Sequence, residues 1–330
     1  MKRWRFLIPA AVLLLLMLRS GAARDAAVQG VEVATRVVFP SLFPFCVLTR
    51  QLPHLGRGGR SAFLMGLCGG YPLGVYTLCR QASAGELSRE EAELLIPLCN
   101  HTGPAIFFGM VGALLFSDPM VCTALYGIHL LSALLLAAMF GLGAGEGSPA
   151  PAKSESITQS IQRGAVSTGL LCAYVVFFSV LLSLLLPPVL GVFHFLPIPE
   201  DVLTAVLSAF ADLPSGIRAV AALGSPALAF LLCSAGISWG GLCVHWQAKS
   251  LWQEAGLQPR GYFAAKALQA AFSLALAFPA AGIIFHVPMP LWPGVLPFLT
   301  VGIKKSVDFF RHVGYDGKKN AKGRRYHAVS

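Results

Sequence analysis

Long uncharged stretches alternate with short charged segments along the whole chain. The uncharged stretches cover residues 6–18, 37–49, 61–79, 94–117, 119–145, 165–199, 219–248 and 267–303. A helix that crosses a bilayer needs about 20 predominantly apolar residues, and several stretches reach that length. Others are shorter or are interrupted by Gly and Pro. The pattern predicts an all-α, polytopic integral membrane protein with about eight to ten membrane segments, some of them re-entrant or interrupted.

Polar segments divide this pattern into units. Residues 1–24 predict an N-terminal span or signal-anchor, because basic residues precede a short apolar run. A cleaved signal peptide is the alternative, and we favour the uncleaved span. The Gly-, Ser- and Pro-rich segment 143–160 predicts a linker. It separates a first repeat at 25–142 from a second at 161–290, and 291–330 forms a terminal apolar segment with a basic cytoplasmic tail.

The two repeats share short strings in the same order. The matches are VVFPS at 37–41 with VVFFS at 175–179, GYPLG at 70–74 with DLPSG at 212–216, and LCN at 98–100 with LCS at 232–234. Transporters often contain such internal repeats, commonly inverted, and bind substrate at the repeat interface where helices are interrupted. The sequence therefore predicts two related halves with a site between them.

Composition narrows the class of protein further. Hydrophobic residues make up 55% of the 330 positions and charged residues only 12%, against about 25% charged in soluble domains. This excludes a soluble enzyme and intrinsic disorder. The net charge is +10, and the segment 304–330 contributes +6 of it through eight Lys/Arg and two Asp. Basic ends beside apolar segments indicate cytoplasmic flanks, so the expected partner is the lipid bilayer and not nucleic acid.

In the first half, two breaks in the apolar pattern are candidates for binding a small molecule. The first contains Gly70, Tyr71, Pro72 and Gly74, and the second is the run Asn100, His101, Thr102, Gly103 and Pro104. A helix that starts after Pro104 would present free N–H groups and a partial positive charge, which favours an anionic or polar ligand. The alternatives are a packing kink at the first break and an ordinary helix cap at the second.

The second half contains two corresponding breaks. Pro214, Ser215 and Gly216 follow Asp212, a candidate for binding a coupling ion, and precede Arg218, a candidate for binding a carboxylate. An Asp212–Arg218 ion pair is the structural alternative. The fourth break covers 236–242, and its candidate binding residues, with those that follow, are Ser238, Gly240, Gly241, His245 and Gln247.

Enzyme motifs are missing from the sequence. It contains no GxSxG, HExxH or P-loop string, and its eight cysteines show no CxxC spacing. We therefore expect no enzyme activity, no cofactor and no metal site, and we interpret the cysteines as small hydrophobic residues. The oligomeric state stays open, a homo-oligomer included.

Four strings together resemble a known family: VVFPSLFPF at 37–45, GGYPLG at 69–74, the stretch 88–104 ending in NHTGP, and GGLCVHWQ at 240–247. They resemble the sporulation integral membrane protein YlbJ family, which carries the nucleoside-recognition Gate domain and is distantly similar to concentrative nucleoside transporters. The resemblance covers about residues 5 to 290. It implies a multi-pass transporter with paired hairpins, located in the cell membrane.

The resemblance also implies a substrate. The family role is export of dipicolinate, a pyridine dicarboxylate, from the mother cell across the outer forespore membrane, which here would require a spore-forming organism. The string DLPSG departs from the Glu-Thr-Asn-Gly-like string of many members. The resemblance and the breaks together predict a secondary transporter of a small anionic aromatic solute, dipicolinate, that works by alternating access. Two alternatives stay open: transport of nucleosides or another small polar solute, and a non-transporting membrane scaffold for spore envelope assembly.

Overall fold

A computed structural model describes residues 4–51, 58–140 and 156–288, and within these residues it contains helices and no strand. This confirms the all-α prediction. Most of the predicted linker, at 143–155, and the predicted tail at 291–330 lie outside the described residues. The eight cysteines are all free.

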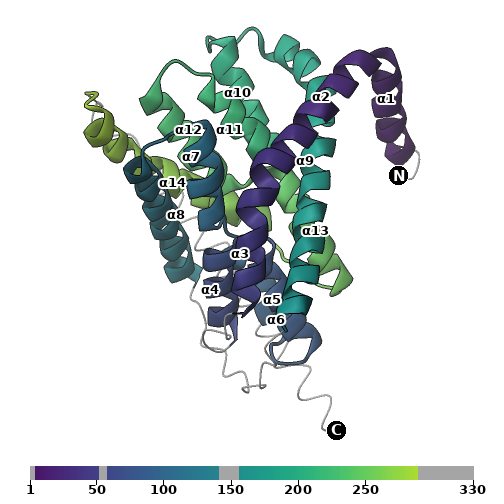
Figure 1. Cartoon of the computed structure of the whole chain (residues 1–330), viewed down its shortest axis with the longest axis vertical. Helices are drawn as coiled ribbons and strands as arrows, with labels where there is room; N and C mark the ends of the chain where they lie inside the picture. Colours follow the sequence, from purple (N-terminus) through teal and green to yellow (C-terminus); the bar gives the residue numbers. More distant parts are fainter. Residues whose placement is uncertain (1–3, 52–57, 141–155, 289–330) are drawn as a thin grey trace.

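The first half begins with a bent pair of helices. Helix α1 (Trp4–Leu18) meets α2 (Ser20–Val33) at an angle of 96° and projects from the rest of the molecule (Figure 1). The π-helical segment η1 (Ala34–Val38) joins α2 to α3 (Phe39–Gln51) without a break. These three segments pack along one long helix of the second half, α9 (Ile157–Phe193).

The remaining elements of the first half are a short hairpin, a broken span and a continuous span. The hairpin consists of α4 (Gly59–Gly69) and α5 (Leu73–Ser83). The broken span consists of α6 (Arg89–Cys99), η2 (Ala105–Val111) and α7 (Gly112–Leu114), and the continuous span is α8 (Pro119–Phe140). The first two candidate breaks are the hairpin tip and the gap in this span.

The second half repeats this order after α9. Its hairpin is α10 (Glu200–Ala211) with α11 (Leu213–Ala221), its broken span is α12 (Pro226–Trp239) with α13 (Gly241–Glu254), and its continuous span is α14 (Tyr262–Phe285). The two hairpins enter from opposite ends of the molecule: α4 and α5 lie at the lower end of Figure 1, and α10 and α11 at the upper end. The elements thus follow the same order with inverted direction, the arrangement of an inverted repeat.

Four helical stretches are long and apolar enough to cross a membrane. They are Pro119–Phe140, Ile157–Phe193, Pro226–Glu254 and Tyr262–Phe285, and the bent pair at the start of the chain makes five. The further segments that the sequence predicts are the short helices of the hairpins and of the first broken span. Those helices are too short to cross a bilayer alone.

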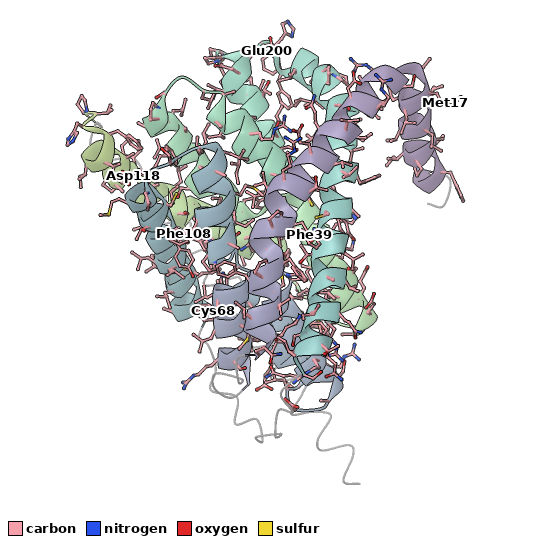
Figure 2. All side chains as sticks on the ribbon, viewed as in Figure 1. Met17, Phe39, Cys68, Phe108, Asp118 and Glu200 are labelled. Carbon is pink, nitrogen blue, oxygen red and sulfur yellow. The ribbon has the colours of Figure 1, made fainter. Side chains whose placement is uncertain are left out.

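Apolar side chains cover the outside of the bundle as well as its inside. Figure 2 shows Phe39 and Phe108 on the outer face at mid-height, and both are exposed. Glu200 lies at the upper end of the view, and Asp118 lies between it and Phe108 in height. A charged end and an apolar girdle are the surface that a lipid bilayer requires.

Two local predictions need correction. The spacing of Ser88 and Glu91 predicts a capping box that opens a short polar helix, 89–95, at the membrane surface. The capping box forms, but the helix does not remain a separate surface helix. It continues inward to Cys99, because its second half is apolar and packs in a buried cluster. The fourth break is also narrower than 236–242: α12 runs through to Trp239, and only Gly240 and Gly241, both at positive φ, interrupt it.

Candidate functional site

In the first half, the hairpin tip and the gap of the broken span touch through their backbones. Gly70 has a φ of +74°, and a Cβ atom placed on it would lie 2.7 Å from the nitrogen of Gly103. A Cβ atom on Gly103 would lie 2.8 Å from the nitrogen of Gly70. Because no side chain fits at either position, both glycines are required for this close approach. We call this contact the first gate.

The second half contains the equivalent contact. Gly241 has a φ of +78°, and a Cβ atom on it would lie 3.0 Å from the nitrogen of Leu213 at the second hairpin tip. Asp212 is fully buried and caps α11, since its Oδ2 accepts hydrogen bonds from the backbone nitrogen and the hydroxyl of Ser215 at 3.0 and 2.6 Å. We call this contact the second gate.

His129 connects the two gates. Its Nε2 accepts a hydrogen bond from the backbone nitrogen of Thr102 at 3.3 Å, and its Nδ1 lies 2.9 Å from the hydroxyl of Ser238. Nε2 accepts, so the ring proton of the neutral imidazole is on Nδ1, and Ser238 accepts from it. The hydroxyl of Thr102 also donates to the carbonyl of Ile237 at 3.0 Å. Because His129 stands near the middle of α8, the two gates meet near the middle of a membrane span.

A second polar network lies beside this bridge. The ammonium of Lys266 donates to the backbone carbonyl of Asn100 at 2.8 Å and to Oε1 of Gln269 at 2.6 Å. The side-chain amide of Asn100 donates to the hydroxyl of Tyr262, which lies 2.9 Å from Nδ1 of His245. The Tyr262 oxygen accepts from Asn100, and its own proton can be donated to His245 Nδ1 when that nitrogen carries no proton. These bonds tie α13 and α14 to Asn100, the residue that directly follows α6.

A cavity of about 440 Å³ lies against the first hairpin tip. Tyr71 and Pro72 form one wall, and Gln247 of α13 forms another. The remaining walls come from α3, α5 and α9 and include Arg50, Arg163, Tyr76 and Tyr174. Arg50 donates to the hydroxyl of Ser167 at 2.9 Å and lies 5.6 Å from the ring of Tyr76. No Asp or Glu lines the cavity, so its polar lining favours an anion.

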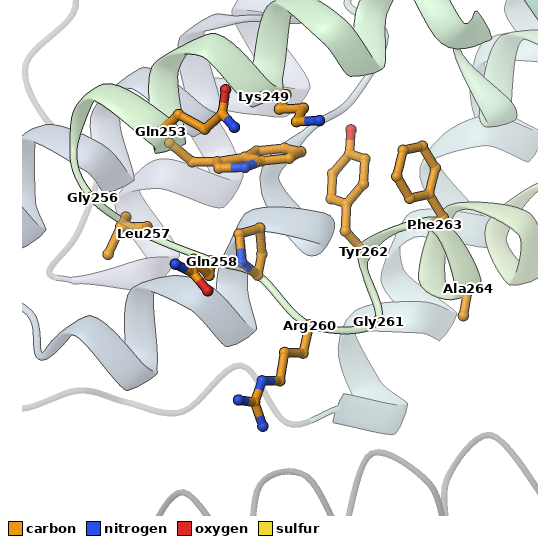
Figure 3. A pocket seen from close by; sticks show the side chains of 12 residues that line it. Lys249, Gln253, Gly256, Leu257, Gln258, Arg260, Gly261, Tyr262, Phe263 and Ala264 are labelled. Atoms are coloured by element: carbon orange, nitrogen blue, oxygen red, sulfur yellow. The ribbon is translucent and has the colours of Figure 1, made fainter. Parts of the chain in front are cut away.

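Another cavity, of about 610 Å³, lies at the turn between α13 and α14 (Figure 3). Lys249, Arg260 and Tyr262 line it together with Trp252, whose ring centroid is 4.7 Å from that of Tyr262. The hydroxyl of the same Tyr262 belongs to the Lys266 network. This cavity therefore ends at the outer wall of that network.

Most of the predicted site residues lie at the gates, in the networks or in the cavity. Arg218 does not: it is exposed and hydrogen-bonds Gln29 Oε1 at 3.3 Å. The expected alternative, an Asp212–Arg218 ion pair, is not formed, because Asp212 turns inward to cap α11. The predicted residues that lie at the gates, in the networks or in the cavity are Gly70, Tyr71, Pro72, Asn100, Thr102, Gly103, Asp212, Ser215, Ser238, Gly241, His245 and Gln247.

The remaining predicted residues flank these contacts. His101 is fully buried, with its ring 5.9 Å from that of His129. Pro104 precedes η2, and Pro214 opens α11. Gly74 and Gly216 pack against neighbouring backbone, of Cys99 and Ala209 respectively, while Gly240 ends α12 at positive φ.

Sequence reasoning missed five residues of the site. Arg50 and Arg163 lie beside the ends of uncharged stretches, where a charged residue indicates only that a membrane segment ends. Lys266 also immediately precedes an uncharged stretch, but α14 begins at Tyr262, so it lies one turn inside the helix. His129 and Tyr262 are polar residues in or beside apolar helices, and a lone polar group at span centre was the available signal for His129.

Comparison with known proteins supports the resemblance drawn from the motifs. The chain is 28% identical over 133 residues to the sporulation integral membrane protein YlbJ of Bacillus subtilis (strain 168). This match covers 34% of the chain and 33% of the relative, so the chain spans about a third of the length of the curated relative that it matches. No family profile and no solved structure matches. Together with the apolar helices, the match supports an integral membrane protein.

Proposed function

We propose that this protein is a secondary transporter that moves a small aromatic anion across the cell membrane, and that dipicolinate is its substrate. The observation that supports this most directly is the 440 Å³ cavity at the first gate, lined by two arginines and three tyrosines without an acidic side chain. Its volume is within the range of pockets that hold small molecules. Guanidinium groups bind carboxylates, and tyrosine rings stack on a planar heteroaromatic ring.

The gates supply the moving parts of the mechanism. Each gate is a backbone contact between a hairpin tip and a helix break, and the hairpins enter from opposite ends of the molecule. Opening one contact while the other stays closed would expose the site to one side at a time, which is alternating access. His129 bonds to Thr102 beside the first gate and to Ser238 at the end of α12 beside the second gate, so it would transmit the state of one gate to the other.

The basic residues support an orientation for this transport. Arg60, Arg80 and Arg89 flank the first hairpin and α6, and Lys249 and Arg260 lie near the turn between α13 and α14. Loops rich in Lys and Arg remain in the cytoplasm. In this proposal the first gate therefore faces the cytoplasm, and its cavity receives an anion from that side. If the organism forms spores, export would proceed from the mother cell across the outer forespore membrane.

The test is flux of labelled dipicolinate into proteoliposomes that contain the purified protein, with uridine measured in parallel. We expect saturable dipicolinate flux and no uridine flux. The variants Arg50→Gln and Arg163→Gln each remove a charged partner of a carboxylate, so about 1.5–3 kcal/mol of binding, or a roughly 10- to 150-fold rise in KM, is expected. Arg24→Gln, an exposed arginine paired with Asp25, is the matched control and keeps the wild-type KM.

Each alternative predicts a different pattern of flux. Uridine flux alone would assign the protein to nucleosides, and folded protein without flux of either solute would favour the scaffold role. Arg218→Ala separates two positions for the carboxylate site. If this variant loses dipicolinate flux while Arg50→Gln and Arg163→Gln keep it, the site lies at the second hairpin and the cavity assignment is wrong.

A further inference from the structure

Lys266 is a buried cation without a buried anion. Its exposed fraction is 2%, and among the described residues it forms no ion pair with Asp or Glu, because the two ion pairs found there are Arg24–Asp25 and Arg36–Glu32. A charge at membrane depth is costly and is usually retained for function. The structure therefore has to stabilise this ammonium by other means.

Oxygen atoms at the break of α6 provide that stabilisation. Asn100 directly follows α6 and is the first residue of the gap, and its carbonyl, freed from the helical pattern, accepts from Lys266 at 2.8 Å. Oε1 of Gln269 accepts at 2.6 Å. The side-chain oxygen of Asn100 is also buried and has no hydrogen-bond partner in the described part of the chain. Carbonyl and amide oxygens at the C-terminal end of a half-helix also form the sites that coordinate a coupling Na⁺ in broken-helix transporters.

The other titratable groups near Lys266 are neutral or basic. His101 between α6 and η2, His129 on α8 and His245 on α13 each interact electrostatically with the lysine. The hydroxyl of Tyr262 on α14 completes the set through Asn100. Among the described residues, the hydrogen-bond partners of the ammonium are two oxygen dipoles, and none of them is a carboxylate.

We propose that the ammonium of Lys266 is a tethered cation that permanently occupies a monovalent-cation site at the break of α6, so that transport does not require Na⁺. Only the consequence for transport, that Na⁺ is not required, rests on the proposed function. The structural part of the inference is that removing the Lys266 amine without filling its volume leaves an oxygen-lined site open. That vacated site then accepts Na⁺ or a small ammonium ion.

Two variants test this inference without reference to transport. Lys266→Ala removes the amine and leaves its volume empty, whereas Lys266→Met fills the same volume with an apolar chain. Melting temperatures of the purified proteins are measured in about 0.1 M NaCl, methylammonium chloride or choline chloride, the last being too large for the site. We expect Na⁺ and methylammonium to raise the melting temperature of the Ala variant by at least about 2 °C over choline. Wild type and the Met variant should show no such difference.

Flux measurements provide the second arm. Wild-type dipicolinate flux should be equal in Na⁺ and in choline, while the Ala variant should transport at least about tenfold faster in Na⁺ or methylammonium than in choline. A Na⁺ requirement in wild type overturns the inference, even if the Ala variant does not fold. The inference is also overturned if the melting temperature of the Ala variant is the same in Na⁺, methylammonium and choline. Cation-dependent stabilisation of the Ala variant without any flux in wild type would overturn the proposed function alone.

Discussion

The close contact of the first gate makes Gly103→Ala an informative substitution. The added Cβ atom would lie 2.8 Å from the nitrogen of Gly70, 2.9 Å from its Cα and 3.0 Å from the carbonyl carbon of Gly69. All three are backbone atoms, so no side chain can rotate away. The hairpin tip has to move by several tenths of an ångström, and overpacking of this kind typically costs about 1–3 kcal/mol.

This cost falls on the state in which the first gate is closed. We expect the melting temperature to fall by about 2–12 °C, given about 2–4 °C per kcal/mol for large domains. If that state is part of the transport cycle, flux should fall by about 5- to 150-fold. Both are measured on the same preparation, by thermal unfolding and by dipicolinate flux into proteoliposomes.

Gly127→Ala is the matched control. Gly127 lies inside α8, and an added Cβ atom there would have no atom within 4 Å. Alanine is favoured over glycine inside a helix by up to about 1 kcal/mol, so this variant should be as stable as wild type or more so. Wild-type melting and flux in Gly103→Ala would refute the close contact between the two breaks and, with it, the gate that we derive from it.

Three further predictions concern individual hydrogen bonds. His129→Ala removes the acceptor of the Thr102 amide and the hydrogen-bond partner of Ser238, and should lower the unfolding free energy by about 1–3 kcal/mol. Unchanged thermal unfolding of this variant would show that the two hydrogen bonds are not formed. Thr102→Val removes the donor to the Ile237 carbonyl while preserving side-chain shape, and should lower the unfolding free energy by roughly 1 kcal/mol in a denaturant titration. A larger effect on the KM for dipicolinate than on stability would assign Thr102 to substrate binding. Ser88→Ala removes the N-cap of α6 and should lower the unfolding free energy by about 1 kcal/mol without changing the KM. Ser156→Ala removes the N-cap of α9 and should have the same effect.

The inverted order of the elements gives these predictions a common basis. Each half contains a hairpin whose tip closes on the break of the next span, and the two closures differ in their residues but not in their kind of contact. Positive-φ glycines make the contact possible on both sides, at Gly70 and at Gly241. Two similar closures in opposite directions are what a protein needs to open to one side at a time.

The sequence by itself determined the features that depend on neighbouring residues. The length of uncharged runs predicted the membrane helices, and the spacing of Ser88 and Glu91 predicted the capping box. Asp201 and Asp212 enclose ten uncharged residues, which are too few for a span, and this spacing predicts a half-helix, which is α10 in the structure. Gly and Pro located the hairpin tips. These signals are readable because hydrogen bonding and backbone freedom act over a few residues.

Only the tertiary structure decided which of those features meet. Side-chain direction and helix register turn Arg218 outward to Gln29, while Asp212 turns inward to cap α11. In the sequence, Lys266 indicates only the edge of an apolar stretch, yet its ammonium donates to the carbonyl of Asn100, 166 positions away. The partners of His129, at Thr102 and Ser238, are likewise distant along the chain. Burial of a polar group depends on what packs around it, so the bridge and the buried cation emerge only when the two halves come together.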